Sequence, residues 1–188
     1  GTDITASLTG SDISFSAPSD YNGNESFTVS VSDGDLSDSQ SFTVTVNAVN
    51  DAPVATTGLL GSTNEDQSVV ISLSASDIDG DNLTFSLDTD ALNGSIEING
   101  TLATYTPNQD FNGDDSFTFG VSDGDLSDTA TVALSIAPVN DAPVLATILD
   151  LSFDEDILGS ISLSSNDIEG DDLSYSISGG TDITASLT

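Results

Sequence analysis

The residues of this chain that could do chemistry are nearly all carboxylates. Among its 188 residues, 32 are Asp or Glu, and Lys, Arg, His and Cys are all absent. Without His, Cys or Lys, the chain lacks the usual nucleophiles and bases of covalent catalysis. Carboxylate and amide oxygens in such numbers are instead suited to binding hard divalent cations, calcium above all.

Two segments have the spacing of a cation-binding loop. Residues 77–81 read Asp-Ile-Asp-Gly-Asp, and residues 167–171 read Asp-Ile-Glu-Gly-Asp. Alternate carboxylates in such a loop can turn toward one ion, while Gly80 permits the backbone reversal around it. Because Asp, Asn and Gly also form good turns without any ion, one such loop alone leaves a plain turn as an equal alternative.

These segments belong to an internal repeat. Val-Asn-Asp-Ala-Pro-Val stands at residues 49–54 and 139–144, and Ser-Asp-Gly-Asp-Leu-Ser-Asp at 32–38 and 122–128, each pair 90 residues apart. Self-similarity at a fixed period is typical of tandem arrays in which every repeat is one structural unit. We therefore expect one unit per 90 residues.

A longer repetition overlies the first. Residues 1–9 and 180–188 both read GTDITASLT, which gives a super-period of 179 residues. We infer an internal window on a polymer of alternating, near-identical units; an engineered permutation is the alternative. The predicted division is the C-terminal half of a repeat at 1–48, a complete repeat at 49–138 and the N-terminal half of a third at 139–188, neither half closing a core alone.

The segments between the acidic motifs have the pattern of short strands. Residues 69–73, 83–87 and 117–121 alternate apolar with polar side chains and are enriched in β-branched and aromatic types. About seven such strands per repeat, separated by Gly, Asn and Asp and without helical periodicity, predict an all-β fold of tandem immunoglobulin-like antiparallel β-sandwiches.

In that fold, the acidic residues lie at the two ends of each sandwich. With the strands named A to G, the entering linker, the B–C loop and the F–G loop share one end of a sandwich, and the A–B and E–F loops share the other. The metal ligands predicted at the entering end of the complete repeat are Asn50, Asp51, Asp77, Asp79, Asp81 and Asp123. Those predicted at its exit are Glu65, Asp66, Asp110 and Asp115, which face Asn140, Asp141, Asp167, Glu169 and Asp171. The matching residues of the two partial repeats are Asp20, Glu25, Asp33 and Glu155.

The convergence of several acidic loops at each junction favours a metal site over plain turns. Calcium takes six to eight oxygen ligands from carboxylates, amides and backbone carbonyls, and the junctions supply all three. Zinc and other transition metals prefer His or Cys, so we expect Ca²⁺, with magnesium second. Bound cations would also offset the self-repulsion of a formal net charge of −32.

Charge, the length of the apolar runs and the repeat pattern each exclude a kind of partner or activity. Nucleic acid is excluded because backbone phosphates are bound by Lys and Arg. Direct membrane insertion is excluded because no apolar run approaches the roughly 20 residues of a spanning helix. We expect no enzyme, because the acids recur with every repeat, whereas a hydrolase that uses paired carboxylates needs them in one pocket.

Three motifs carry a resemblance to a known family: the Asn-Asp-Ala-Pro-Val linker, the Ser-Asp-Gly turn, and Phe-Asn-Gly-Asp-Asp-Ser-Phe at 111–117. The chain resembles, over essentially its whole length, the cadherin-like tandem repeats of bacterial giant surface adhesins of the repeats-in-toxin type. The resemblance implies calcium held between repeats by Glu65, residues 110–115, Asn140 with Asp141, and Asp167 with Glu169. The exit motif lacks an Asp-Arg-Glu-type triplet and the linker is shorter, which leaves the number of ions open.

Two functions follow from these observations. The first is a calcium-stiffened structural extender of a giant secreted adhesin or matrix protein, located at the cell surface or in the extracellular matrix, with neighbouring repeats joined through calcium. The alternative is the repeat unit of a self-assembling extracellular filament, sheath or surface layer, formed by lateral self-association. Glycan binding has no aromatic cluster to support it.

Overall fold

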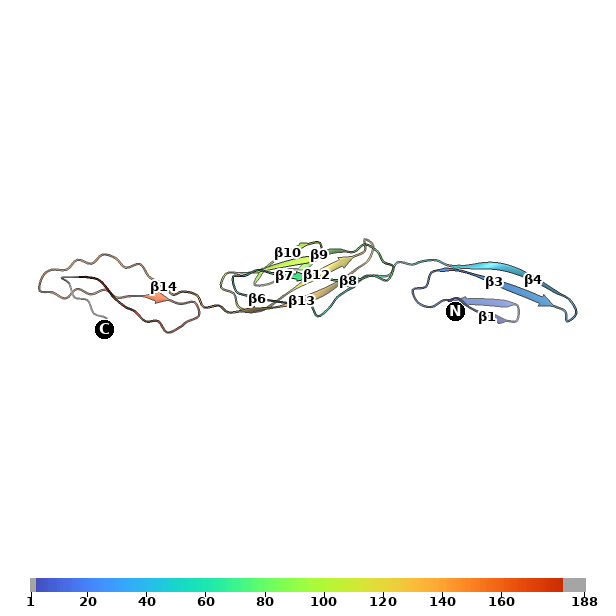
Figure 1. Cartoon of the computed structure of the whole chain (residues 1–188), viewed down its shortest axis with the longest axis horizontal. Helices are drawn as coiled ribbons and strands as arrows, with labels where there is room; N and C mark the ends of the chain where they lie inside the picture. Colours follow the sequence, from blue (N-terminus) through green and yellow to red (C-terminus); the bar gives the residue numbers. More distant parts are fainter. Residues whose placement is uncertain (1–2, 181–188) are drawn as a thin grey trace.

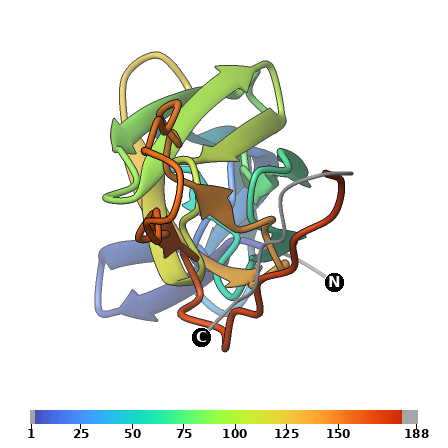
Figure 2. The same ribbon diagram turned by 90° about the vertical axis from the view of Figure 1, so that its left-hand side faces the viewer.

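The computed structural model describes residues 3–180, and it is elongated (Figure 1). We call residues 3–46 the N-terminal sheets, residues 54–137 the middle sandwich and residues 144–180 the C-terminal segment. The three parts follow one another along the long axis, and they overlap when viewed down that axis (Figure 2). No helix in the described range is long and apolar enough to cross a membrane. The predicted all-β class is confirmed.

The middle sandwich has two main sheets. The larger sheet has the order β6-β13-β12-β9 and the smaller β10-β11-β7, while β5 and β8 form a separate pair. The strands of the larger sheet are β6 (Leu60–Asn64), β13 (Ser127–Ala137), β12 (Gly113–Ser122) and β9 (Thr84–Thr89). The remaining strands are β10 (Gly94–Asn99), β11 (Leu102–Pro107), β7 (Val69–Ser72), β5 (Val54–Ala55) and β8 (Ala75–Ser76).

One pairing departs from the antiparallel prediction. Strand β6 runs parallel to β13, with Leu60 opposite Ala133 and Asn64 opposite Ala137. The expected strand A is divided: β5 pairs with β8, the chain crosses over at Gly58 with φ of 75°, and β6 then joins the other sheet. Because β6 and β13 run in the same direction, the residues that follow each strand emerge side by side at one end of the sandwich.

The core lies between the two sheets. Along β13 buried and exposed residues alternate, which puts Val132 and Leu134 inside. Tyr105 of β11 and Phe119 of β12 are fully buried, and the Phe119 ring lies 6.1 Å from that of Phe85 between centroids. This packing fixes both sheets and therefore the loops at their ends.

The N-terminal sheets repeat the second half of the middle sandwich. They comprise β1 (Thr5–Thr9) paired with β2 (Asp12–Ser16), and β3 (Gly23–Ser32) paired with β4 (Ser37–Val46). The register is the one found 90 residues later: Gly23 lies opposite Val46 as Gly113 lies opposite Ile136. Three phenylalanines, Phe15, Phe27 and Phe42, pack together with ring centroids 5.2–6.2 Å apart.

The C-terminal segment repeats the beginning of the middle sandwich only in part. Strands β14 (Val144–Leu145) and β15 (Ser165–Asn166) pair as β5 and β8 do. The described residues 148–162 form no strand, although their equivalents include β6 and β7. The reason is physical: β6 and β7 are hydrogen-bonded to β13 and β11, and within residues 3–180 no equivalents of those two strands lie beside the C-terminal segment.

Candidate metal centres at the two junctions

The larger acidic group lies at the exit end of the middle sandwich, and we call it the second junction. Its carboxylates come from four places: the turn after β6, the turn before β12, the linker after β13 and the loop after β15. The members are Glu65, Asp66, Asp110, Asp141, Asp167 and Glu169. The parallel pairing of β6 with β13 brings the first and third of these places together.

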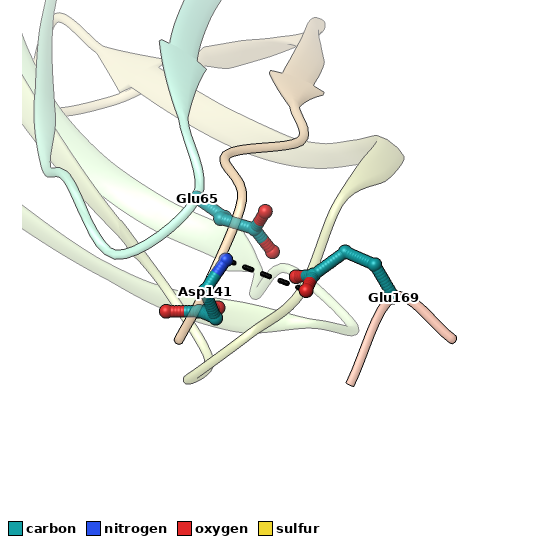
Figure 3. A group of neighbouring side chains, drawn as sticks. All are labelled: Glu65, Asp141 and Glu169. Carbon is teal, nitrogen blue, oxygen red and sulfur yellow. Dashed lines mark hydrogen bonds between the residues drawn. The ribbon is translucent and has the colours of Figure 1, made fainter. Parts of the chain in front are cut away.

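Asp141 is the centre of the second junction. Carboxylate oxygens of Asp141, Glu65 and Glu169 lie within 4.8 Å of one another. Carboxylate oxygens of Asp141, Asp66 and Asp110 also lie within 4.8 Å of one another. Figure 3 shows Glu65 and Glu169 approaching Asp141 from different segments. The backbone N–H of Asp141 donates to Glu169 Oε2 at 3.3 Å, which ties the linker to the following loop.

Glu65 is the only charged side chain among the described residues to be almost fully buried, with 2% of its surface exposed. One carboxylate oxygen accepts the backbone N–H of Val139, and the other accepts Nδ2 of Asn112 at 3.3 Å. Burying an unpaired carboxylate is costly unless opposite charge or hydrogen bonds compensate. Two neutral donors do so only in part, and the chain has no cationic side chain to add.

The turns that carry the carboxylates have a strained backbone. Asp66 and Asp110 adopt φ of 59° and 58°, and so do Asp20 and Asp156 at the equivalent positions, with 59° and 67°. Left-handed φ is uncommon outside glycine, though Asp tolerates it, and such residues cluster at functional sites. Asp66 Oδ1 accepts the backbone N–H of Asp110 at 3.1 Å, which joins the two turns.

The electrostatics of Asp141 favour a bound cation. Burial raises the pKa of Asp141 above its usual value, and Asp110, Asp66 and Glu65 raise it further by repulsion. Its Oδ2 atom is buried and has no hydrogen-bond partner within the described residues. A buried acceptor without a donor, surrounded by other carboxylates, has the chemistry of a ligand for a hard cation. The donor set therefore fits calcium.

The first junction, at the entering end of the middle sandwich, shares the contact between the linker and the following loop. The backbone N–H of Asp51 donates to Asp79 Oδ2 at 2.8 Å, as Asp141 does to Glu169. Burial raises the pKa of Asp51, and repulsion from Asp20, Asp79 and Asp77 adds to the effect. The linker aspartate is thus crowded by carboxylates at both junctions.

The loop after β8 completes the first junction. Asp77 Oδ1 accepts the backbone N–H groups of Asp79, Gly80 and Asp81 at 2.9, 3.0 and 3.3 Å, so this carboxylate closes the turn. Its other oxygen, Oδ2, is buried and without a partner in the described range. The carboxylates of Asp77, Asp79 and Asp81 have oxygens within 4.8 Å of one another.

Several predicted ligands lie outside these groups. Asp115 accepts the backbone N–H groups of residues 92, 93 and 116 and the Tyr105 hydroxyl, at 2.8–3.1 Å. Burial raises the pKa of Asp115, but these donors outweigh it and the pKa is lowered. Glu25, at the equivalent position, likewise accepts the backbone N–H groups of Asp3 and Ile4 at 2.6 and 2.9 Å.

The F–G turns use their aspartates in a similar way. Asp123 accepts the backbone N–H groups of residues 125 and 126 at 2.7 Å, and its Oδ2 accepts Asn50 Nδ2 at 2.9 Å. Asp33 caps its own turn at 2.8 and 3.0 Å. These hydrogen bonds lower the pKa of both aspartates. For Asp123, the bond from the backbone N–H of Leu126 has the largest effect.

The remaining predicted residues lie beside the junctions. Asn140 Nδ2 donates to the backbone oxygen of Asp141 at 3.0 Å, and the backbone N–H of Asp171 donates to Asp167 Oδ1 at 3.0 Å. Glu155 is exposed. Asn112 lies within the range 110–115 that the resemblance implies, but its hydrogen bond to Glu65 and the left-handed aspartates were not predicted from the sequence.

Comparison with known proteins identifies the middle sandwich. Residues 50–135 match the sequence family described as bacterial Ig domain. They form an immunoglobulin-like domain. The cis-dimer structure of protocadherin gammaB7 EC3-6 shares this fold, with a TM-score of 0.51 at 18% identity over 82% of this chain and 43% of that one. Human protocadherin-24 EC1-2 has a TM-score of 0.49 at 19% identity, over 74% and 82% of the chains. The prediction of an immunoglobulin- and cadherin-like domain is confirmed.

The alignment with one curated relative is longer than this immunoglobulin-like domain. Chitinase A of Pseudoalteromonas piscicida is 34% identical over 132 residues, which cover 68% of this chain and 16% of that protein. The alignment thus spans about a sixth of the relative's length. Immunoglobulin- and cadherin-like domains are typically non-catalytic, so a match of this extent fits an accessory part of that enzyme.

The hydrogen bonds of Asp115 generate a prediction about the immunoglobulin-like domain. Asp115→Asn places an amide against N–H donors and should lower the free energy of unfolding at pH 7 by about 1–3 kcal/mol, with or without calcium. Because the folded pKa is lowered, this stabilisation exists above the unfolded pKa of about 3.9 and is lost as pH falls through the folded pKa. Denaturant unfolding from pH 7 to pH 3 should therefore show a shrinking difference from the parent. The exposed neighbour offers the control Asp114→Asn, and equal stability of both variants at pH 7 would refute the role.

Proposed function

We propose that both junctions bind calcium and that the chain is a calcium-stiffened extender in a large extracellular bacterial protein. The observation that carries this proposal is Asp141. Its buried carboxylate oxygen has no donor within residues 3–180, and it lies among four neighbouring carboxylates that come from three other segments. No side chain of the protein can neutralise this charge. A divalent cation from the medium can.

The proposal includes the division of the chain into repeats. Residues 49–138 are one complete repeat, and residues 1–48 and 139–188 are parts of its neighbours in a tandem array. The acidic groups then fall at the boundaries between repeats, where a bound ion touches both sides. The 90-residue recurrence of the Asp51–Asp79 contact as Asp141–Glu169 supports this reading.

Calcium fits the ligand set better than other cations. The predicted holders at the second junction are Glu65, Asp66, Asp110, Asp141 and Glu169, and those at the first are Asp20, Asp51, Asp77, Asp79 and Asp81. All donors are oxygens on turns and loops, and calcium accepts irregular geometry where magnesium demands a near-ideal octahedron. The ion would supply positive charge that replaces mutual repulsion with attraction.

The mechanical consequence follows from the position of the ligands. Asp141 is in the linker, Glu65 is in the preceding sandwich, and Glu169 is in the following segment. An ion shared by the three fixes the linker relative to both sides and removes freedom from the hinge. At free calcium a hundredfold above the dissociation constant, one site adds about 2.7 kcal/mol to the folded state.

The proposal of an extracellular, non-enzymatic role rests on the acidic composition and on the chitinase relative. Abundant extracellular calcium suits the acidic composition, and the chitinase relative supports a secreted context in which such domains accompany a catalytic one. A spacer within a secreted polysaccharide-degrading enzyme is therefore the second candidate, beside an adhesin or matrix protein. Both share the same mechanism at the junctions, with the ion acting as a structural element.

The direct test is thermal unfolding of the full chain at fixed ionic strength in calcium, in magnesium and in chelator. We expect the midpoint to rise by about 10 °C in calcium, because one or more sites stabilise a unit of roughly 90 residues, and much less in magnesium. Identical midpoints in all three solutions would mean that the carboxylates serve only to keep the surface charged.

The effect of Asp141→Asn on the unfolding midpoint should have opposite signs in chelator and in calcium. In chelator, the raised pKa means that the ionised form is destabilising above the unfolded pKa, so removing the charge should raise the midpoint at pH 7. In calcium, the same change removes a ligand and should lower the midpoint. Asp114→Asn is the control, with little effect in either medium. A shift of the same sign in both media would contradict the assignment.

A further inference from the structure

Two hydrogen bonds fasten the linker that enters the middle sandwich to the sandwich itself. Asn50 Nδ2 donates to Asp123 Oδ2 at 2.9 Å, and the backbone N–H of Ala55, in β5, donates to Asp128 Oδ2 at 2.9 Å. Each bond joins residues that are 73 positions apart in the sequence. We call this pair of bonds the latch. Because the latch holds the chain at two points, the entering linker has little freedom relative to the sandwich.

The latch joins two of the repeated motifs. Both acceptors belong to the Ser-Asp-Gly-Asp-Leu-Ser-Asp motif at residues 122–128. The donor Asn50 belongs to the Val-Asn-Asp-Ala-Pro-Val motif at residues 49–54, and the donor Ala55 follows that motif directly. The two motifs are therefore partners in space, although they are far apart in the sequence.

Both acceptors of the latch are held in place by the sandwich. Asp123 Oδ1 accepts the backbone N–H groups of residues 125 and 126 at 2.7 Å, which leaves Oδ2 for the linker. Asp128 lies in β13, opposite Val121 of β12. Hydrogen bonds lower the pKa of both carboxyls, that from Leu126 most for Asp123 and that from Ala55 most for Asp128. Because N–H donors stabilise the ionised form, these two carboxylates need no cation.

The exit linker, which follows β13, is held to the same sandwich in a different way. The backbone N–H of Val139 donates to a carboxylate oxygen of Glu65, which is itself a member of the acidic group. The carboxylates that repel Asp141 most are those of Asp110, Asp66 and Glu65, and all three belong to the middle sandwich. Without a cation, this repulsion acts to separate the exit linker from the sandwich.

We propose that the middle sandwich keeps its entering linker through the latch with or without calcium, and keeps its exit linker only when calcium is bound. The hinge of the calcium-free chain then lies on the exit side of the sandwich, and calcium closes that side alone. Asp123 and Asp128 are positioning residues: they hold the linker that carries Asp51 to the first junction, and they do not bind the ion. The calcium step rests on the proposed function, whereas the latch does not.

Amide hydrogen exchange of the full chain, followed by NMR in calcium and in chelator, tests both sides of the sandwich. In chelator, the Ala55 amide should keep the protection that it has in calcium. Exchange of the Val139 amide should become more than about tenfold faster in chelator, because its hydrogen bond to a charged group is lost. Loss of protection at both amides in chelator overturns the inference. Equal protection of Val139 in both solutions would instead remove the calcium step, and the proposed function with it, while Ala55 still reports on the latch.

Exchanging the amide and the carboxylate of the latch between their two positions gives a test by rescue. Asn50→Asp places two carboxylates together, so in chelator the backbone order parameter at position 50 should fall from about 0.85 to below about 0.6. Asn50→Asp combined with Asp123→Asn restores one donor and one acceptor, and should return the order parameter to the parent value. A double variant that is as mobile as the single variant overturns the latch, because a pair in contact must show this coupling.

The second bond of the latch has its own variant and a matched control. Asp128→Ala should speed exchange of the Ala55 amide by more than about tenfold in both solutions, because it removes the acceptor. Asp125→Ala changes an exposed aspartate of the same turn, whose side chain accepts no hydrogen bond within residues 3–180, and should leave Ala55 unchanged. The amide of Leu134, buried in β13 between two strands, reports global unfolding and should exchange as in the parent. Unchanged exchange at Ala55 in Asp128→Ala overturns the role of Asp128.

Discussion

The structure depends on how a chain without any cationic side chain can hold carboxylates together. Asp141 has the carboxylates of Glu65, Asp66, Asp110 and Glu169 around it. Neutral donors satisfy some oxygens, such as those of Glu65, but Oδ2 of Asp141 has no partner among the described residues. The proposed calcium ions would supply the positive charge that this arrangement lacks.

The topology of the sandwich creates this constraint. The parallel pair of β6 and β13 brings the end of strand A beside the exit linker, and the left-handed turns at Asp66 and Asp110 direct two more carboxylates to the same place. Because the sequence recurs every 90 residues, the contact between the linker aspartate and the following loop recurs at the first junction, between Asp51 and Asp79.

Much of this could be predicted from the sequence, and the failures have physical causes. The alternating segments 69–73, 83–87 and 117–121 correspond closely to β7, β9 and part of β12, because a two-sided pattern specifies a half-buried strand. The division of strand A was not predictable, since the crossover at Gly58 depends on pairing with β8. Residue type also does not separate a ligand from a turn cap: Asp115 and Asp77 are both aspartates near a sandwich end, but Asp115 has donors on both oxygens and Asp77 on one. That distinction exists only in three dimensions.

Calcium binding at the junctions can be measured by isothermal titration calorimetry of the full chain at 0.15 M salt, about physiological ionic strength, with magnesium as the reference titrant. We expect saturable binding of calcium with a defined stoichiometry, and weak or absent saturation with magnesium, because only a preformed set of oxygen ligands distinguishes the two ions. Heats that never saturate, or that are the same for both ions and vanish as salt increases, would show a diffuse counter-ion atmosphere and contradict the account.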